Sequence, residues 1–302
     1  MTNEKKLLLI LNPKAGKCRG IKLLPELLSL FQGNGFLPTV LLTTKSGEAS
    51  VFARRFGSDH DLIVCVGGDG TLSEVISGVV QGNVSRPIGY IPAGSTNDYG
   101  TSLGLSADLL TAAGDIITGS PARFDVGLYN GQPFVYVAAF GMLAKVSYST
   151  SQDIKNLLGH SAYVLEGIRN LPSLQSCHME IEIDGEQIEG DFILGLISNT
   201  LTVGGLLRFD PAQVMMDDGL LEIMLISMPS SPKEFTDTIQ AVSTQNYTNC
   251  SSIIFRKGQR IRIRSLDPTY WSLDGEYAQS CEQTEILSVP NAIQIIIPQN
   301  RG

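Results

Sequence analysis

Apolar residues in the first part of this chain follow two alternating patterns. Short apolar runs are typical of buried strands, and they occupy Leu7 to Leu11, Pro38 to Leu42, Leu62 to Val66 and Ile88 to Ile91. Apolar residues at helical spacing predict helices over Ile21 to Phe31, Glu48 to Phe56 and Leu72 to Val80. Because a helix tolerates proline in its first turn, Pro25 allows the first helix to begin later than Ile21. Strands that alternate with helices predict a parallel sheet covered by helices.

After Pro121 the pattern changes to segments of β character. The expected strands are Phe134 to Ala138, Met179 to Ile183, Phe192 to Ile197, Leu220 to Ile226, Ile253 to Arg256 and Ile261 to Ile263. The expected helices are Tyr163 to Arg169 and Phe235 to Val242, and Asp184-Gly185 is typical of a hairpin turn. Short strands joined in this way predict an antiparallel β-sandwich.

These patterns divide the chain into two domains. We expect an α/β nucleotide-binding domain over residues 1–125 and a β-sandwich substrate domain over residues 126–290. The apolar run Ile293 to Ile297 predicts a strand within residues 291–302, and this strand is free to return to either domain.

The composition is that of a soluble globular protein, with 43% hydrophobic and 17% charged residues. No apolar run approaches the ~20 residues needed to cross a bilayer, and no signal peptide precedes the first strand, so we expect a cytoplasmic protein. The five cysteines are scattered and never in C-x-x-C spacing, which indicates neither a disulfide framework nor a zinc site.

The charge of the chain argues against one class of partner. A formal net charge of −8 is unlike that of a general nucleic-acid binder, which carries a basic face. Arg260, Arg262 and Arg264 alternate with two isoleucines, so on a strand three cations share one face. Two interpretations of this face remain open, a solvated strand face and contact with an anionic membrane.

The most informative motif is the glycine-rich segment Gly67-Gly68-Asp69-Gly70-Thr71, between a predicted strand and a predicted helix. Glycines let the backbone come close to a ligand, and the N-terminus of the helix attracts an anion. Asp69 repels a bare phosphate, so its presence indicates a divalent cation that bridges carboxylate and phosphate. The segment therefore predicts an ATP-Mg²⁺ site.

Two better-known glycine motifs do not match. A Rossmann fingerprint needs its third glycine at the position of Ser73. A Walker A pattern needs a glycine at the position of Leu11 and Ser or Thr at that of Cys18, which follows Gly16-Lys17. Neither an ordinary NAD-binding domain nor a P-loop is indicated.

Two further loops follow predicted strands, Asn12 to Lys17 and Gly94 to Asp98. Ligands of open α/β sheets bind beyond the carboxyl ends of strands, so we expect these loops and Gly67 to Thr71 to converge on one cleft. Lys14 and Lys17 add positive charge that phosphates can use.

Some of these polar residues also have structural explanations. Thr71 and Glu74 match a capping box, in which each side chain satisfies the free N–H group of the other residue. Asp98 lies at the expected start of a helix, where a carboxylate is favoured. Capping and nucleotide contact are compatible at Thr71 and Glu74, whereas for Asp98 both capping and catalysis remain open.

Three more motifs complete a recognisable order along the chain: Phe209-Asp210-Pro211, Asp217-Asp218-Gly219-Leu220 and Leu273-Asp274-Gly275-Glu276. Together with the three loops, they resemble the diacylglycerol kinase catalytic-domain family, specifically its soluble bacterial lipid kinases. The resemblance covers nearly the whole chain, and it is the order and spacing of the motifs that make it specific. Ser95 stands where this family usually has Thr, and it keeps the hydroxyl.

The resemblance implies a role for each site residue. The implied nucleotide contacts are Asn12, Pro13, Lys14, Ala15, Gly16, Lys17, Thr43, Gly67, Gly68, Asp69, Gly70, Thr71, Leu72, Ser73, Glu74, Ser95 and Asn97. The implied catalytic residues are Asp69, Asp98 and Glu276, with Glu276 as the general base. A second metal is implied at Met215, Asp218 and Leu220, and Asp125 either links to that metal through water or accepts a hydrogen bond at the domain junction.

The implied function is an ATP- and Mg²⁺-dependent lipid kinase with its active site in the inter-domain cleft. Diacylglycerol is the leading acceptor, and sphingoid bases and phosphatidylglycerol remain open. The implied partner is a lipid at a membrane surface, which allows peripheral contact with the inner face of the membrane. No nucleic-acid partner is expected, and an oligomer is possible.

Two alternatives stay open. An NAD kinase has a similar Gly-Gly-Asp-Gly-Thr loop, although Leu273 to Glu276 and Asp217 to Gly219 fit the lipid kinases better. A regulator that binds nucleotide and lipid without transfer is the other alternative, and the presence of Asp69 and Glu276 argues against it.

Overall fold

The computed structural model describes residues 4–141, 175–203, 207–210, 214–266, 269–279 and 281–299. The chain divides into two compact units, Met1–Val126 with Pro290–Gly302, and Gly127–Val289. The predicted helix Tyr163 to Arg169 lies outside the described residues. None of the helices within these ranges combines the length and the apolar character that a membrane crossing needs.

The first unit contains a parallel sheet in the strand order β17-β4-β3-β1-β2. Its strands are β1 (Lys5–Leu11), β2 (Phe36–Leu42), β3 (Leu62–Gly67), β4 (Ile88–Pro92) and the end of β17 (Gln283–Ile297). The central strands β1, β3 and β4 are almost entirely buried, as expected of a parallel sheet covered on both faces. The last strand of the chain therefore returns to the first unit, where Ile295 pairs with Ile88.

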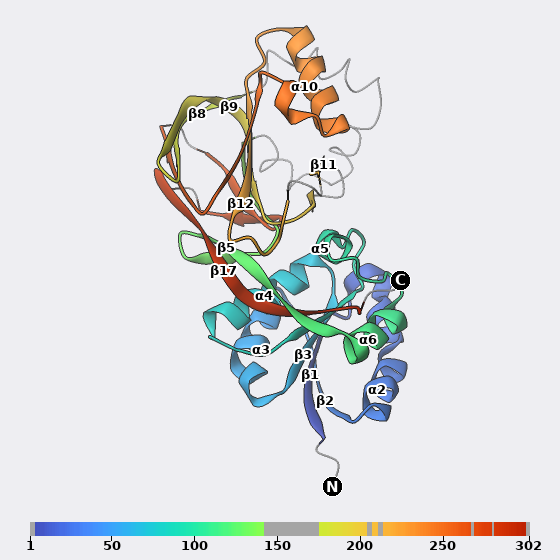
Figure 1. Cartoon of the computed structure of the whole chain (residues 1–302). Coiled ribbons are helices and arrows are strands. Elements are labelled where there is room, and N and C mark those ends of the chain that lie inside the picture. The colour runs from blue at the N-terminus through green and yellow to red at the C-terminus, as the bar shows by residue number, and fades with distance from the viewer. Residues whose placement is uncertain are drawn as a thin grey trace. The chain divides into compact units, whose positions relative to one another are not determined.

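Helices cover both faces of this sheet (Figure 1). They are α1 (Arg19–Lys22), α2 (Leu24–Gly33), α3 (Glu48–Phe56), α4 (Asp69–Gln81), α5 (Asp98–Ser102) and α6 (Leu109–Thr118). Phe31 of α2 and Ile116 of α6 share one hydrophobic core with Leu9 and Val64 of the sheet. In Figure 1, α3 and α4 lie on the opposite side of the sheet from α2 and α6.

The predicted first helix is interrupted. The structure has α1 and α2 instead of one helix over Ile21 to Phe31, with Leu23 between them. Pro25 lies in the first turn of α2, as the sequence suggested, because proline lacks the N–H group that a helix interior needs. Helix α6 was not predicted, although Asp108 caps it by accepting a hydrogen bond from the Thr111 N–H at 2.8 Å.

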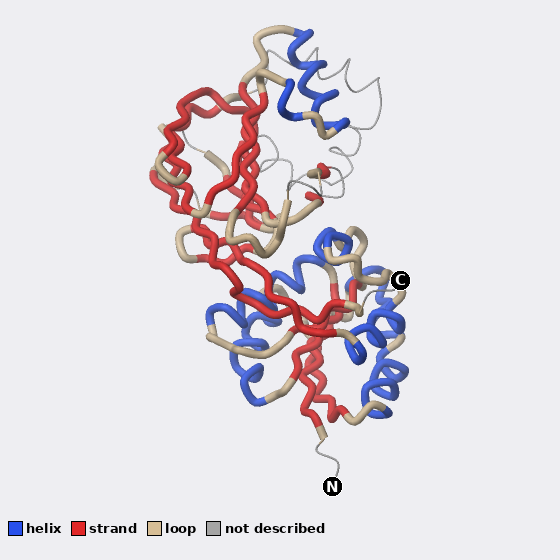
Figure 2. Tube along the Cα trace, viewed as in Figure 1, coloured by secondary structure: helices blue, strands red, loops and turns tan. Residues whose placement is uncertain are grey.

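The second unit is largely β structure (Figure 2), and its strands pair antiparallel. Its strands are β6 (Gln132–Phe134), β7 (Val137–Gly141), β8 (Cys177–Ile183), β9 (Glu186–Ser198), β10 (Thr202–Val203), β11 (Leu207–Arg208), β12 (Leu221–Ser227), β13 (Ile253–Gly258), β14 (Arg260–Ser265), β15 (Trp271–Leu273) and β16 (Glu276–Ala278). Strands β5 (Ser120–Tyr129) and β17 pass from one unit into the other. The predicted fold class, a parallel α/β domain followed by a β-sandwich domain, is confirmed.

The second unit has two hydrophobic clusters. One lies inside the β structure and includes Phe140, Phe192 and Trp271. The other places Leu196 and its neighbours against Val242 of helix α10 (Pro232–Thr244). The predicted helix Phe235 to Val242 is therefore confirmed, and its apolar face packs on the sheet.

The predicted strand Phe134 to Ala138 is wrong in its middle. Strand β6 ends at Phe134 and β7 begins at Val137. The N–H groups of Val135, Tyr136 and Val137 donate to the Asp274 carboxylate, so the first two residues do not join a ladder. A side chain far along the chain thus sets this strand boundary.

Tight turns join several of these strands. Asp184-Gly185 and Asp274-Gly275 are two-residue hairpin loops in which all four residues have positive φ. Asp-Gly suits such loops because glycine takes positive φ at no cost and aspartate tolerates it. The predicted turn at Asp184-Gly185 is confirmed.

Candidate functional site

Three loops meet beyond the carboxyl ends of β1, β3 and β4. The Asn12 side chain donates from Nδ2 to the Thr71 Oγ1 at 3.2 Å, and its Oδ1 accepts from the Lys14 N–H at 3.0 Å. The N–H groups of Asp98 and Tyr99 donate to the Asp69 carboxylate at 3.0 and 3.2 Å. The structure thus brings together the loops that the sequence placed in one site.

Glycine is required where these loops touch. Gly16 has φ +49°, and a Cβ there would lie 1.7 Å from the Ala93 carbonyl oxygen. A Cβ on Gly94 would lie 2.6 Å from the Gly68 Cα. No side chain fits at these contacts, so the loops present backbone and a few polar groups, which suits a phosphate ligand.

Asp69 is half-buried and lies near another acid, Asp98. It caps the short helix α5, which begins at Asp98. Burial raises the pKa of the Asp69 carboxyl, the N–H groups of Asp98 and Tyr99 oppose that rise, and the Asp98 charge adds to it. A divalent cation would relieve the repulsion between these two carboxylates, so they fit the Mg²⁺ of a nucleotide.

The capping box predicted for Thr71 and Glu74 is wrong. Helix α4 begins earlier, at Asp69, and so Thr71 lies within its first turn. The Glu74 carboxylate instead accepts from the Gly47 N–H at 2.8 Å, the Ala49 N–H at 3.1 Å and the Ser46 hydroxyl at 3.1 Å. Glu74 therefore caps helix α3 and fixes the segment that follows Thr43.

The other predicted nucleotide contacts vary in exposure. Lys14, Lys17 and Ser95 are exposed, whereas Thr43 is buried. Asn97 closes its own loop, because its Oδ1 accepts from the Gly94 N–H at 2.9 Å and its Nδ2 donates to the Gly94 carbonyl at 3.1 Å. The exposed lysines and hydroxyl are the groups most available to a ligand.

Glu276 begins strand β16, directly after the hairpin turn. Its side chain is exposed, and within the described ranges it has no hydrogen-bond or ion-pair partner. The preceding Asp274 is 8% exposed and holds the Val135–Val137 segment through its carboxylate. No local pattern around Asp274 predicts this contact, because the Val135–Val137 segment lies far from the motif along the chain.

At the predicted second metal site, Asp218 forms an ion pair with a lysine side chain. The Asp218 Oδ1 accepts from the Leu220 N–H at 3.0 Å, and its Oδ2 lies 3.1 Å from the Lys257 Nζ. No group of three or more His, Cys, Asp or Glu side chains is arranged around a metal position in the described part of the chain. Asp125 is fully buried and accepts from the Asn291 N–H at 2.8 Å, as its alternative role predicted.

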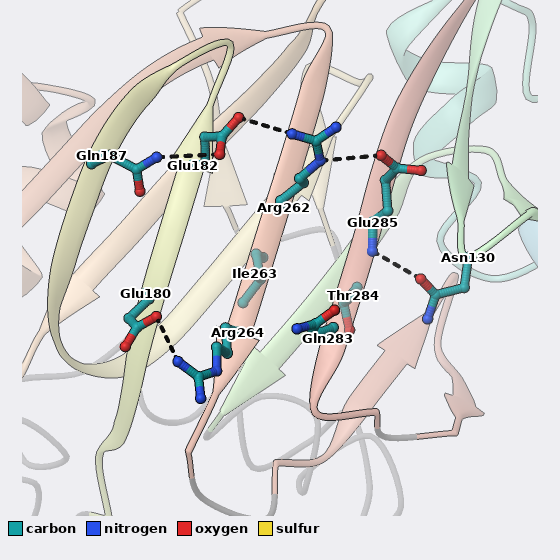
Figure 3. A pocket seen from close by; sticks show the side chains of 10 residues that line it. All are labelled: Asn130, Glu180, Glu182, Gln187, Arg262, Ile263, Arg264, Gln283, Thr284 and Glu285. Carbon is teal, nitrogen blue, oxygen red and sulfur yellow. Dashed lines mark hydrogen bonds and ion pairs between the residues drawn. The ribbon is translucent and has the colours of Figure 1, made fainter.

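The arginine face of β14 is neutralised by acids (Figure 3). Arg262 lies 3.2 Å from Glu182 and 3.4 Å from Glu285, and Arg264 lies 3.3 Å from Glu180. These side chains line a polar hollow of about 480 Å³. The arrangement favours the solvated strand face over contact with an anionic membrane, because the arginines are already paired.

Comparisons with known proteins agree with this geometry. The family model "Diacylglycerol kinase catalytic domain" matches residues 6–129, and "YegS C-terminal NAD kinase beta sandwich-like domain" matches residues 136–297. A diacylglycerol kinase of Bacillus subtilis (strain 168) is 31% identical over 296 residues, which cover 97% of each chain. The chain belongs to the diacylglycerol kinase family. Members of this family are lipid kinases, so the predicted enzyme class is confirmed.

Other diacylglycerol kinases extend the comparison. That of Staphylococcus carnosus (strain TM300) is 30% identical over 298 residues, covering 98% of this chain and 96% of its own. A crystal structure of a diacylglycerol kinase from Bacillus anthracis str. Sterne has a TM-score of 0.77 at 24% identity, and it covers 98% of both chains. A second structure from that strain has a TM-score of 0.82 at 26% identity, covering 98% of this chain and 96% of its own.

Proposed function

We propose that this member of the diacylglycerol kinase family transfers the γ-phosphate of ATP to the hydroxyl of diacylglycerol, which yields phosphatidic acid. The observation that carries the proposal is the convergence of three glycine-containing loops around the half-buried Asp69 and the buried Asp98. Such a site binds phosphates through backbone N–H groups and a cation.

The residues of the first unit have distinct roles in this proposal. The backbone of Asn12–Lys17 and Gly67–Thr71 binds the phosphates, while the lysine ammonium groups neutralise part of their charge. Asp69 and Asp98 would hold the Mg²⁺ that accompanies ATP, because their carboxylate oxygens are the ligands this cation prefers. The cation supplies charge neutralisation on the transferred phosphate when it is bound.

Glu276 has the role of general base. Its carboxylate accepts the proton of the lipid hydroxyl, whose oxygen then attacks the γ-phosphorus as the bond to ADP breaks. An exposed glutamate without a partner in the described part of the chain suits this role, because its carboxylate oxygens are available to the lipid hydroxyl. Because the acceptor is a lipid, the reaction takes place at a membrane surface on the cytoplasmic side, where ATP is available.

The second metal remains part of the proposal, at Met215, Asp218 and Leu220. Lys257 already neutralises Asp218, so the site has less need of a metal than the sequence suggested. Thermal unfolding with Mg²⁺ or EDTA tests it. A melting temperature that rises with Mg²⁺ in the wild type but not in Asp218→Asn supports a metal, and equal responses count against it.

The test of function is transfer of labelled γ-phosphate from Mg²⁺-ATP to diacylglycerol, a sphingoid base, phosphatidylglycerol and NAD. We expect Glu276→Gln to lose about 100-fold or more of kcat, within the usual range for a general base, and to keep ATP binding. Glu186→Gln is the matched control, because Glu186 follows the other Asp-Gly turn and pairs with Arg256 at 3.0 Å. We expect it to keep full activity.

One alternative has specific support. The family model that matches residues 136–297 carries the name of an NAD kinase β-sandwich-like domain. Phosphorylation of NAD with no lipid product would favour that activity over ours. Tight ATP binding with no product on any acceptor would favour a regulator that binds without transfer.

A further inference from the structure

The chain contains the tripeptide Asp-Gly-Glu twice, each time at a two-residue hairpin turn. The two copies are Asp184-Gly185-Glu186 between β8 and β9, and Asp274-Gly275-Glu276 between β15 and β16. The aspartates have φ 48° and 50°, and the glycines 97° and 88°. The two turns are therefore a natural pair for comparison, because their sequence and backbone conformation match.

Asp274 ties its turn to the Val135–Val137 segment with five hydrogen bonds. Its carboxylate accepts from the N–H groups of Val135, Tyr136 and Val137 at 2.8, 3.0 and 3.0 Å. Its own N–H donates to the Val137 carbonyl at 2.8 Å, and its carbonyl accepts from the Tyr136 hydroxyl at 2.6 Å. Bonds from N–H groups to a buried carboxylate are strong, so the turn has little freedom to move.

The turn at Asp184-Gly185 is anchored in a similar way, but its glutamate makes different contacts. Asp184 accepts from the N–H groups of Gln259 and Arg260, both at 2.8 Å. Glu186 then forms an ion pair with Arg256, which occupies both of its carboxylate oxygens. Glu276 has no such partner within the described ranges. One turn thus uses its glutamate for structure, and the other leaves it available.

We propose that Asp274 is the positioning residue for Glu276, and that Tyr136 completes this support. The inference rests on the proposed function, in which Glu276 accepts the proton of the lipid hydroxyl. A base must be held within a fraction of an ångström of its working position, and errors near 1 Å reduce rates strongly. Asp274 provides that precision through the backbone, and the Glu276 carboxylate has no partner within the described ranges.

The experiment compares Asp274→Asn with Asp184→Asn. Asparagine has nearly the shape of aspartate, but its amide N–H₂ group opposes the N–H groups that the carboxylate accepts. We expect Asp274→Asn to lower kcat for lipid phosphorylation about 10- to 100-fold without changing the KM for ATP. Asp184→Asn loses a similar anchor, so it is expected to lower the melting temperature while keeping kcat.

Two further readouts separate positioning from general damage. Amide hydrogen exchange at residues 135–137 and 273–276 is expected to accelerate in Asp274→Asn and not in Asp184→Asn. Tyr136→Phe removes one of the five hydrogen bonds, so it is expected to lower kcat several-fold in a protein that still folds. If Asp274→Asn does not fold, Tyr136→Phe is compared with Asp184→Asn in its place.

The possible failures can be told apart. Unchanged kcat in Asp274→Asn and Tyr136→Phe, with an active wild type, would overturn the positioning role and leave the proposed function standing. A wild type that phosphorylates no lipid overturns both. Equal loss of kcat in Asp274→Asn and Asp184→Asn would show a general effect of stability and would also overturn the positioning role.

Discussion

Asp69, which the proposed function places in the site, destabilises the fold when it is ionised. Its half-buried carboxylate lies near Asp98. Partial burial, and to a smaller extent the Asp98 charge, raises the pKa of Asp69, while the N–H groups of Asp98 and Tyr99 oppose that rise. A raised pKa means that the folded protein holds the proton more tightly than the unfolded chain does. Ionisation of Asp69 therefore lowers stability as pH rises from 3.8 through the raised pKa, and the loss persists at neutral pH.

We predict that Asp69→Asn abolishes phosphate transfer but leaves the free energy of unfolding at pH 7 equal or higher. Asparagine caps helices about as well as aspartate, and it carries no buried charge. Asp108→Asn is the control, because Asp108 caps α6 at an exposed position and should keep activity. Urea unfolding at pH 4 and pH 7 tests whether ionisation of Asp69 lowers the free energy of unfolding. A variant that is less stable than the wild type at pH 7 would contradict this account.

At the residue scale, the sequence pointed to candidate site residues and missed some of the hydrogen bonds that the structure shows. Glycine and acid motifs pointed to Asp69 and Glu276 because their local patterns carry the signal. The hydrogen bonds that Glu74 and Asp274 accept were not predicted, because each carboxylate binds backbone N–H groups of a segment far away in sequence. Such partners leave no local pattern, because every residue except proline offers the same N–H group.

Glu74 links two elements of the first unit. It lies on α4 and accepts three hydrogen bonds from residues at the start of α3. We predict that Glu74→Ala costs about 2 kcal/mol of stability, as expected for hydrogen bonds to a charged group. We also predict that it raises the KM for ATP several-fold, because Thr43 precedes the released segment.

A matched variant separates these two effects. Glu234 accepts from the Ser230 N–H and hydroxyl at the start of α10, in the other unit. Glu234→Ala should therefore lower the melting temperature without changing the KM for ATP. If both variants change the KM equally, the link between Glu74 and the nucleotide loops is wrong.

A buried charge pair joins strands β12 and β13. Glu222 is fully buried opposite Lys257, whose Nζ lies 3.2 Å from the Glu222 Oε1. Burial raises the pKa of Glu222 to about 7, although the charge of Lys257 opposes the rise. We predict that Lys257→Met costs about 3 kcal/mol, because it leaves a buried carboxylate uncompensated.

Glu222→Gln in the same background should recover most of that loss. Arg256→Met is the control for a surface pair, since Arg256 and Glu186 are both about half exposed, and it should cost at most about 1 kcal/mol. Chemical denaturation of the four proteins gives these energies. Equal losses in Lys257→Met and Arg256→Met would contradict the role given to burial.

Secondary structure was predictable wherever local pattern decided it. The buried strands and the helix Glu48 to Phe56 were found because their apolar spacing is regular. The signal for α6 was also present, in Asp108 followed by apolar residues at helical spacing, and it was overlooked. The gap between β6 and β7 could not be found, because the distant Asp274 side chain creates it.

At the scale of the whole molecule, the first unit is completed by residues from the end of the chain. Ile293, Ile295 and Ile296 are buried in it, and Gly119 lies so close to the Ile297 carbonyl that a Cβ would be 2.4 Å away. Each buried isoleucine contributes about 1.5–3 kcal/mol. Their sum is comparable to the ~5–15 kcal/mol that stabilises a typical domain.

We predict that a chain ending at Val289 loses the first unit and keeps the second. Limited proteolysis should digest residues 1–126 and spare a fragment close to Gly127–Val289. A chain ending at Gln299 is the control and should resist digestion throughout. Protection of residues 1–126 in the shorter chain would show that the unit does not need its last strand.

The return of β17 to β4 also has a consequence for synthesis. A ribosome makes the first 126 residues and then the whole second unit before the end of β17 emerges, which pairs with the free edge of β4. At about 5–20 residues per second, that interval lasts roughly ten seconds or more. During this time the nascent chain presents an open, apolar strand edge, which is the kind of surface that chaperones bind and that pairs with neighbouring chains.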